Sequence, residues 1–137
     1  MSKFESSVKR LDYPQQTVYE KMSDLRNLEK VRDRIPADKV ADFDSGEDWV
    51  SLSVAPIGTV KLKIVEREEP KCIKMETEKS PFPFTLWVQL LPLDESSCKM
   101  KLTVKAELNP FIKMLIEKPL TEGVEKVADA ITLIRFN

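Results

Sequence analysis

The segment from Cys98 to Glu107 alternates strictly between two kinds of side chain. Apolar residues occupy every second position, and lysine, threonine or glutamate residues fill the positions between them. Successive side chains of a β-strand point to opposite faces of its sheet, so this strand has one buried and one solvated face. Parallel sheets are normally covered on both faces, whereas antiparallel sheets can leave one face in water. The segment therefore predicts an antiparallel sheet that is covered on a single side.

A long helix is predicted directly after this strand. Asn109 is a favoured N-cap residue, and Pro110 suits the first helical position, where a missing N–H costs no hydrogen bond. Apolar residues then recur every three or four positions up to Phe136, which is the period of an amphipathic helix. Pro119 removes a hydrogen bond within this stretch, and Gly123 adds a second weak point. We therefore expect the helix to kink or to divide into two segments here.

The first two thirds of the chain predict a strand, two short helices and a series of hairpins. Residues 3–11 form the first expected strand. Apolar residues then recur at helical spacing from Val18 to Ile35, and a cap at Ser23-Asp24 divides this stretch into two short helices. From residue 39 the period changes to two, and clusters of Gly, Pro, Asp and Ser mark the turns between strands. The expected order is one strand, two helices, six strands and a long helix.

Composition favours a single domain, residues 1–137, that folds without a disulfide or a metal ion. A chain of 137 residues buries about two thirds of its unfolded surface. Its 22 Lys and Arg nearly balance 23 Asp and Glu, which argues against nucleic acid or an anionic membrane as the main partner, although a local basic patch is compatible with this balance. The chain has no His, the commonest metal ligand. Cys72 and Cys98 lack C-x-x-C spacing, which favours buried thiols over a bridge or a nucleophile.

No segment of the sequence predicts membrane insertion or export. Met1 to Arg10 is polar and lacks the apolar core of a signal peptide. No apolar run approaches the ~18 residues that a membrane span requires. We therefore expect a cytoplasmic protein with no cofactor and no membrane span.

The order of elements resembles that of the START-like superfamily, also called SRPBCC. Its helix-grip fold is α+β and wraps a curved antiparallel sheet around a long C-terminal helix; here we expect about seven strands, with two short helices after the first. The resemblance implies a cavity between sheet and helix that takes lipids, sterols or polyketides, as in the polyketide cyclase-like branch. Metal-binding members use His and Asp residues, so the lack of His argues against that branch. Three segments carry the resemblance: KFESSVKRLDYPQQTVYEKMSDLRNLEKV, WVSLSVAPIGTVKLKIVEREEPKCIKMETE and KMKLTVKAELNPFIKMLIEKPLTEGVEKVADAI.

The residues expected to line this cavity are large apolar side chains of three neighbouring strands and of the start of the terminal helix. Apolar pockets with few polar groups are typical small-molecule sites, although the same residues also suit an ordinary core. Trp87 lies on the opposite face by alternation. The segment Ser80 to Phe84 predicts either a rigid lip at the cavity mouth or a plug. The expected lining residues are Met75, Leu86, Val88, Leu102, Val104, Phe111, Met114 and Leu115.

The sequence is compatible with three functions. The first is binding of a small hydrophobic ligand, such as a lipid, a sterol-like or a polyketide-like molecule, without catalysis. The second is a cyclase- or hydratase-type enzyme, for which Glu66, Glu117 and Tyr19 are candidates, although they form no visible catalytic dyad. The third is an interaction module that pairs with another protein, or with itself as a homodimer, through a sheet edge or helix face. A lining without ionisable groups favours the first.

Overall fold

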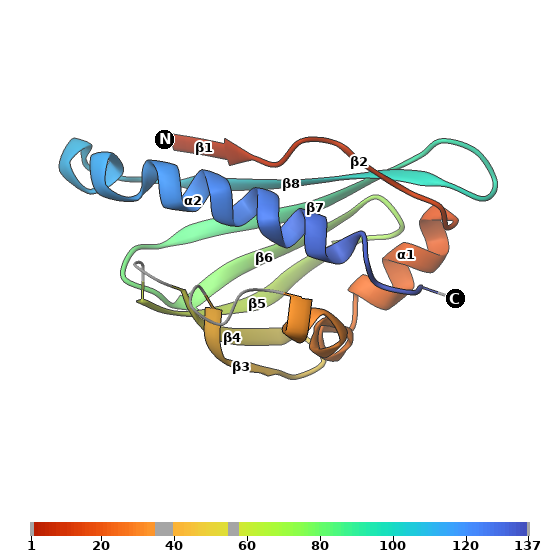
Figure 1. Ribbon diagram of the computed structural model, residues 1–137, viewed down its shortest axis with the longest axis horizontal. Coiled ribbons are helices and arrows are strands. Elements are labelled where there is room, and N and C mark those ends of the chain that lie inside the picture. The colour runs from red at the N-terminus through yellow and green to blue at the C-terminus, as the bar shows by residue number, and fades with distance from the viewer. Residues whose placement is uncertain (1, 35–39, 55–57, 137) are drawn as a thin grey trace.

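Eight strands form one open sheet, and a long C-terminal helix lies across one of its faces (Figure 1). The computed structural model describes residues 2–34, 40–54 and 58–136. The strands are β1 Ser2–Glu5, β2 Lys9–Leu11, β3 Val40–Ser45, β4 Trp49–Val54, β5 Gly58–Glu68, β6 Cys72–Lys79, β7 Phe84–Pro92 and β8 Cys98–Ala106. Their order is β1-β8-β7-β6-β5-β4-β3, with β2 also paired to β8, and every pairing is antiparallel. The predicted helix-grip architecture is confirmed.

In the described part of the chain, three helical segments accompany the sheet. The helix α1 spans Gln15–Met22, the 3₁₀-helix η1 spans Leu25–Arg34, and α2 spans Pro110–Ile131. α2 runs beside β1 and β8 and passes η1, while α1 lies next to β7. No helix of the described residues has the length and apolar character needed to cross a membrane.

The first predicted strand is divided in the structure into β1 and β2. Between them, the Ser6 N–H donates to the Leu102 carbonyl (2.9 Å), and the Ser6 Oγ accepts from the Leu102 N–H (2.9 Å). A side-chain oxygen therefore replaces the backbone carbonyl that would normally continue the ladder. The chain leaves the regular pairing at Ser6–Val8 and resumes it in β2, which gives eight strands where about seven were expected.

α2 is a single continuous helix, so the predicted division at Pro119 and Gly123 is wrong. The predicted cap is present, because the Asn109 Oδ1 accepts from the Ile112 N–H (2.8 Å). Tertiary packing on both sides of the proline explains the continuity, since most helical stability in proteins comes from burying an apolar face. The buried residues before and after Pro119 are Ile116, Leu120, Val124, Ala128, Ala130 and Ile131.

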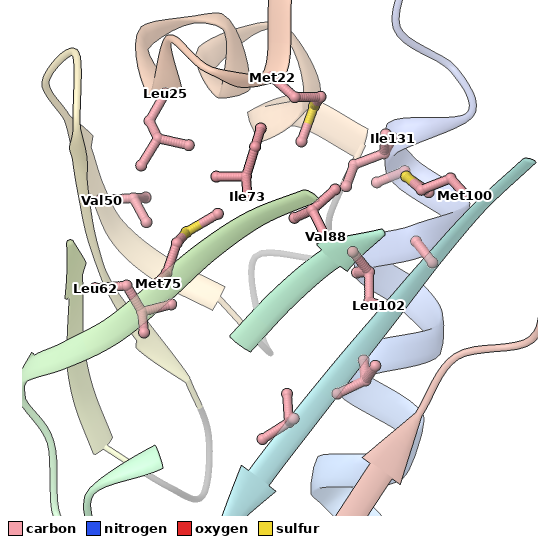
Figure 2. Packing of buried hydrophobic residues seen from close by; sticks show 14 of the residues in the cluster. Met22, Leu25, Val50, Leu62, Ile73, Met75, Val88, Met100, Leu102 and Ile131 are labelled. Carbon is pink, nitrogen blue, oxygen red and sulfur yellow. The ribbon is translucent and has the colours of Figure 1, made fainter. Parts of the chain in front are cut away.

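The core fills the space between the inner face of the sheet and the helices. Figure 2 shows apolar side chains from α1, η1, α2 and the strands β4 to β8 that point toward a common interior. Phe136, which follows α2, also packs in the core: it is buried, and its ring centroid lies 5.4 Å from that of Tyr13, edge to face. The residues labelled in the figure are Met22, Leu25, Val50, Leu62, Ile73, Met75, Val88, Met100, Leu102 and Ile131.

Candidate functional site

Five of the predicted lining residues lie together on the inner face of the sheet. The strand register pairs Met75 with Leu86, and Leu86 with Val104. On the next row, Val88 pairs with Leu102. All except Leu86 are 3 % exposed or less. Strand pairing thus brings residues from β6, β7 and β8 into one apolar surface, as alternation predicts.

Leu86 is partly exposed, although both of its neighbours in the row are buried. Met75 and Val104 on either side are each 3 % exposed. Leu86 packs against the core cluster, and Trp87 after it lies on the outer face, so the Leu86 side chain belongs to the inner face. Among the described elements, α2 makes its closest approaches to β1, β8 and η1. The helices therefore leave this part of the inner face incompletely covered.

The three predicted residues of α2 lie outside this surface. Phe111, Met114 and Leu115 are 67 %, 73 % and 58 % exposed. Buried residues of α2 recur every fourth position from Ile116 to Ala128. Ile112, four residues before Ile116, is partly buried against the core. Ile112 is the residue of the first turn that faces inward, and the sequence signal for it was its place in the same helical stripe. Contact of the eight predicted residues with a ligand stays a prediction.

A second wall of the interior comes from α1, η1 and the far strands. Met22 and Leu25 are 2 % and 0 % exposed, and Val50 on β4 is 4 % exposed (Figure 2). The cavity prediction did not include them, because it considered only the strands next to the terminal helix. Their helical spacing and strand alternation were nevertheless readable in the sequence.

The segment Ser80–Phe84 inserts one aromatic ring into the core. Phe82 is 7 % exposed, and its ring centroid lies 5.7 Å from that of Phe84. Pro81 and Pro83 on either side of Phe82 are exposed. Of the two predicted roles, this arrangement favours the plug.

No Asp, Glu, Lys or Arg side chain is buried in the described interior. The buried polar side chains there are the hydroxyls of Ser6 and Ser97, besides the phenol of Tyr19, which is 4 % exposed; buried Thr103 lies on the outer face, opposite Trp87. Glu66 is exposed because the ladder between β5 and β6 shifts register just before it. Glu117 is exposed as well. Of the three predicted catalytic candidates, Tyr19 alone is buried.

The cysteines and the acidic residues offer no reactive or metal-binding cluster within the described chain. Cys98 is buried and Cys72 is partly buried, and both thiols are free. Burial raises the pKa of each thiol, so both remain protonated and weakly nucleophilic near neutral pH. No group of three or more Cys, Asp or Glu residues among those described could hold a metal ion.

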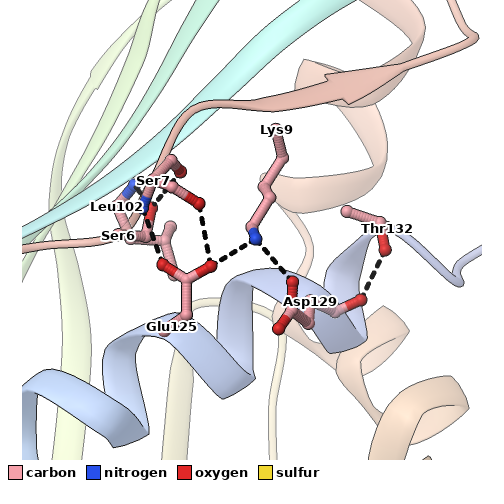
Figure 3. Close-up of polar contacts among 7 residues, drawn as sticks. All are labelled: Ser6, Ser7, Lys9, Leu102, Glu125, Asp129 and Thr132. Atoms are coloured by element: carbon pink, nitrogen blue, oxygen red, sulfur yellow. Dashed lines mark hydrogen bonds and ion pairs between the residues drawn. The ribbon is translucent and has the colours of Figure 1, made fainter.

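A polar clasp joins the second half of α2 to the edge of the sheet (Figure 3). Glu125 accepts hydrogen bonds from the Ser7 N–H (2.7 Å) and the Ser7 hydroxyl (2.8 Å), and it pairs with the Lys9 ammonium. Lys9 also pairs with Asp129 (2.6 Å). These contacts, with the Lys9 bond first, lower the pKa of Glu125 to about 2. The clasp joins α2 to Lys9 of β2 and to Ser7 between β1 and β2.

The outer face of the sheet carries lysines and two tryptophans. The Lys74 and Lys105 ammonium groups lie 5.9 and 5.6 Å from the Trp87 ring centroid. The Lys61 ammonium lies 5.1 Å from the Trp49 ring. Cation–π contacts of this kind are typical of a solvated sheet face, where lysine stems cover an aromatic ring.

No family model matches the sequence, and no curated protein matches it. Solved structures do match. Norcoclaurine synthase from Thalictrum flavum superposes with a TM-score of 0.71 at 15 % identity, covering 96 % of this chain and 84 % of that chain. A START superfamily protein from Mycobacterium smegmatis superposes with a TM-score of 0.64 at 14 % identity, covering 95 % of this chain and 94 % of that chain. The chain has the START-like, or SRPBCC, fold.

A third matching structure, of a protein from Thermus thermophilus, has a TM-score of 0.66 at 17 % identity and covers 96 % of this chain and 94 % of that chain. Identities this low establish the fold alone. One fold of this kind hosts many activities, so function has to be argued from the residues of the site. The polyketide cyclase-like branch stays a prediction.

Proposed function

We propose that the chain binds a small apolar molecule of the lipid, sterol-like or polyketide-like class, without catalysis, between the inner face of the sheet and α2. The observation that carries this proposal is the partial exposure of Leu86 between two buried neighbours. A large apolar side chain at the centre of an inner face is normally covered by the opposite layer. A ligand seated there would complete the cover.

The chemistry of the surrounding surface supports an uncharged ligand. Met75, Val88, Leu102 and Val104 surround Leu86, and the described interior holds no buried charge to pair with a ligand charge. A ligand that buries about 200 Å² of apolar surface gains on the order of 5 kcal/mol, from which the cost of immobilising it is subtracted. The predicted affinity is therefore modest and selective for shape rather than for polar groups.

The comparisons support a small-molecule site and leave catalysis open. The norcoclaurine synthase structure holds dopamine and hydroxybenzaldehyde, so that protein of the same fold accommodates small aromatic molecules. It is also an enzyme, and an enzyme needs a positioned acid, base or nucleophile. In this chain Glu66 and Glu117 are exposed, and Tyr19 is the buried candidate that remains. The lack of a buried acid or base partner for Tyr19 among the described residues favours binding.

Native mass spectrometry of the chain purified from its own host, followed by solvent extraction, tests the proposal. We expect a species heavier than the bare chain, and an apolar molecule in the extract. A Leu86→Trp variant, which fills the partly exposed position, should retain less of this molecule. Leu91→Trp, at an exposed leucine of the same strand, is the matched control and should retain as much as the unmodified chain. A bare chain with an empty extract would refute the proposal.

A further inference from the structure

Three large apolar side chains are exposed together at the start of α2. Phe111, Met114 and Leu115 are 67 %, 73 % and 58 % exposed. Their spacing of three and four residues places them on one face of the helix. Single exposed apolar residues are ordinary, but adjacent ones on a small surface mark an interaction site. We call these three residues the apolar tip.

The apolar tip points away from the protein interior. Phe111 and Leu120 are nine residues apart, which is about 180° around an α-helix. Leu120 is buried, so Phe111 faces outward. The first turns of α2 also extend past the ends of the neighbouring strands (Figure 1). The helix therefore presents one apolar face to the core along its length and a second, opposite one at its projecting start.

The size, borders and projecting position of the apolar tip together indicate what kind of partner fits it. With about 200 Å² for a large apolar side chain, the three exposed fractions amount to on the order of 400 Å². A stable protein–protein interface buries about 800 Å² on each partner, of which about 450 Å² is apolar, so the tip alone lies at the lower end of that range. Exposed Glu117 and Lys118 border the tip on the next turn, exposed Glu122 follows about one turn later, and these charges limit its extension. A narrow projecting tip suits a fluid lipid interface, because binding there scales with the apolar area inserted and needs no matching partner surface.

The charges around the apolar tip suit the headgroup region of a bilayer. Lys113 and Lys118 are exposed, and lysine stems can lie along apolar material while their ammonium groups reach the phosphates. Exposed Glu107 and Glu117 lie nearby and weaken this attraction. Apolar insertion should therefore dominate, with a moderate preference for anionic lipid.

We propose that the start of α2 docks on the surface of a lipid bilayer, with Phe111, Met114 and Leu115 inserted at the boundary between headgroups and acyl chains. Lys113 and Lys118 then lie at the level of the phosphates. This docking stands on exposed residues and does not depend on what the interior binds.

Flotation of the full chain with vesicles tests the docking. We expect the chain to float with phosphatidylcholine vesicles, and more strongly when phosphatidylglycerol is added. The triple variant Phe111→Ser, Met114→Gln, Leu115→Gln should bind at least tenfold more weakly, because it removes the inserted apolar surface. The matched control is Leu91→Gln, Leu93→Gln, Leu133→Gln, which removes three other exposed leucines and should bind normally.

A second variant separates the two contributions. Lys113→Gln, Lys118→Gln should keep binding to phosphatidylcholine and lose the added affinity for phosphatidylglycerol. Circular dichroism establishes that each variant is folded. Failure of the unmodified chain to float, or equal losses in the triple variant and its control, would overturn the docking. It would also fall if light scattering showed a dimer that the triple variant abolishes, since the tip would then be an interface between copies.

The experiments can refute the docking and the binding of an interior ligand independently of each other. Leu86→Trp changes no residue of the apolar tip, so it should float with vesicles as the unmodified chain does while it retains less of the apolar molecule in native mass spectrometry. Retention without flotation would overturn the docking alone, and flotation without retention would refute the proposed function alone.

Discussion

Replacing Glu125 by Gln tests whether the clasp holds α2 in place. Gln keeps an acceptor for the Ser7 N–H but removes the charge that pairs with Lys9. Lys9 would keep its pairing with Asp129. Glu122→Gln is the matched control, because Glu122 is an exposed acid of the same helix one turn earlier. We expect Glu125→Gln to lower the free energy of unfolding and Glu122→Gln to leave it nearly unchanged.

The size of the effect follows from the pKa shift and from solvent exposure. A fall in pKa from 4.5 to about 2 would correspond to about 3 kcal/mol if it acted without screening. The Glu125 side chain is 36 % exposed, and exposed ion pairs contribute at most about 1 kcal/mol because water screens them. The two hydrogen bonds from Ser7 keep the expected value near that upper limit. We therefore expect a loss of about 1 kcal/mol, or about 4 °C in Tm.

The pH dependence has a definite sign. The folded-state pKa of Glu125 is depressed, so its contribution is fully present above the unfolded-state value of 4.5 and is lost as the pH falls toward 2. The pKa of Lys9 is raised, first by Asp129 and then by Glu125, so its contribution is lost only when the pH rises above its usual value of 10.5. Near neutral pH the clasp is at full strength.

Urea unfolding at neutral pH and again near pH 3 measures both effects. The difference between the unmodified chain and Glu125→Gln should be largest at neutral pH and should shrink in acid. Equal stability of the two proteins at neutral pH would refute the reasoning, and so would a difference that grows as the pH falls.

Three further outcomes are expected. Leu102→Ala should cost about 2–5 kcal/mol of unfolding free energy, because Leu102 is 2 % exposed, whereas Leu91→Ala, at an exposed residue of the neighbouring strand, should change it by less than about 0.5 kcal/mol. Asn109→Ala should cost about 1 kcal/mol in urea unfolding, because it removes the acceptor for the Ile112 N–H; an unchanged midpoint would contradict the cap. Tyr19→Phe should retain the extracted molecule unchanged if the chain is a binder, and altered conversion of that molecule would instead favour an enzyme.

Much of the fold could be predicted because its strands and helices carry clear periods. The alternation that ends at Ala106 and the cap at Asn109 located the last strand and the start of the long helix within a residue or two. The predicted division at Pro119 was wrong because it rested on the low helix propensity of proline alone. The burial of Ile116 and Leu120 on either side of the proline stabilises the helix there. Tertiary packing overrides one missing hydrogen bond.

The candidate site was predictable on the strands and not on the helix. Side chains of a strand alternate between two faces, so each strand residue can be assigned to a face from its position. The inner-face positions of Met75, Val88 and Val104 were therefore predictable. In the helix, steps of three and four allow several neighbouring stripes, and the first turn projects beyond the sheet. Leu115 is therefore exposed while Ile112 packs inward.

The partial exposure of Leu86 is a property of the assembled layers. It depends on how closely the helices approach β7, whereas the closest contacts of α2 are with β1 and β8, next to the clasp. No local pattern in β7 distinguishes Leu86 from Val88, which is 1 % exposed one step further along the same face. The spacing of residues within one strand does not predict the distance between that strand and a helix elsewhere in the sequence.

Methyl NMR spectra recorded while the chain is titrated with the molecule extracted from its host test the central claim most directly. The account predicts that methyl signals of Met75, Leu86, Val88 and Val104 shift together and saturate, while those of exposed Leu91 stay in place. Shifts confined to exposed residues such as Met114 and Leu115, with the inner-face methyl signals unchanged, would contradict it.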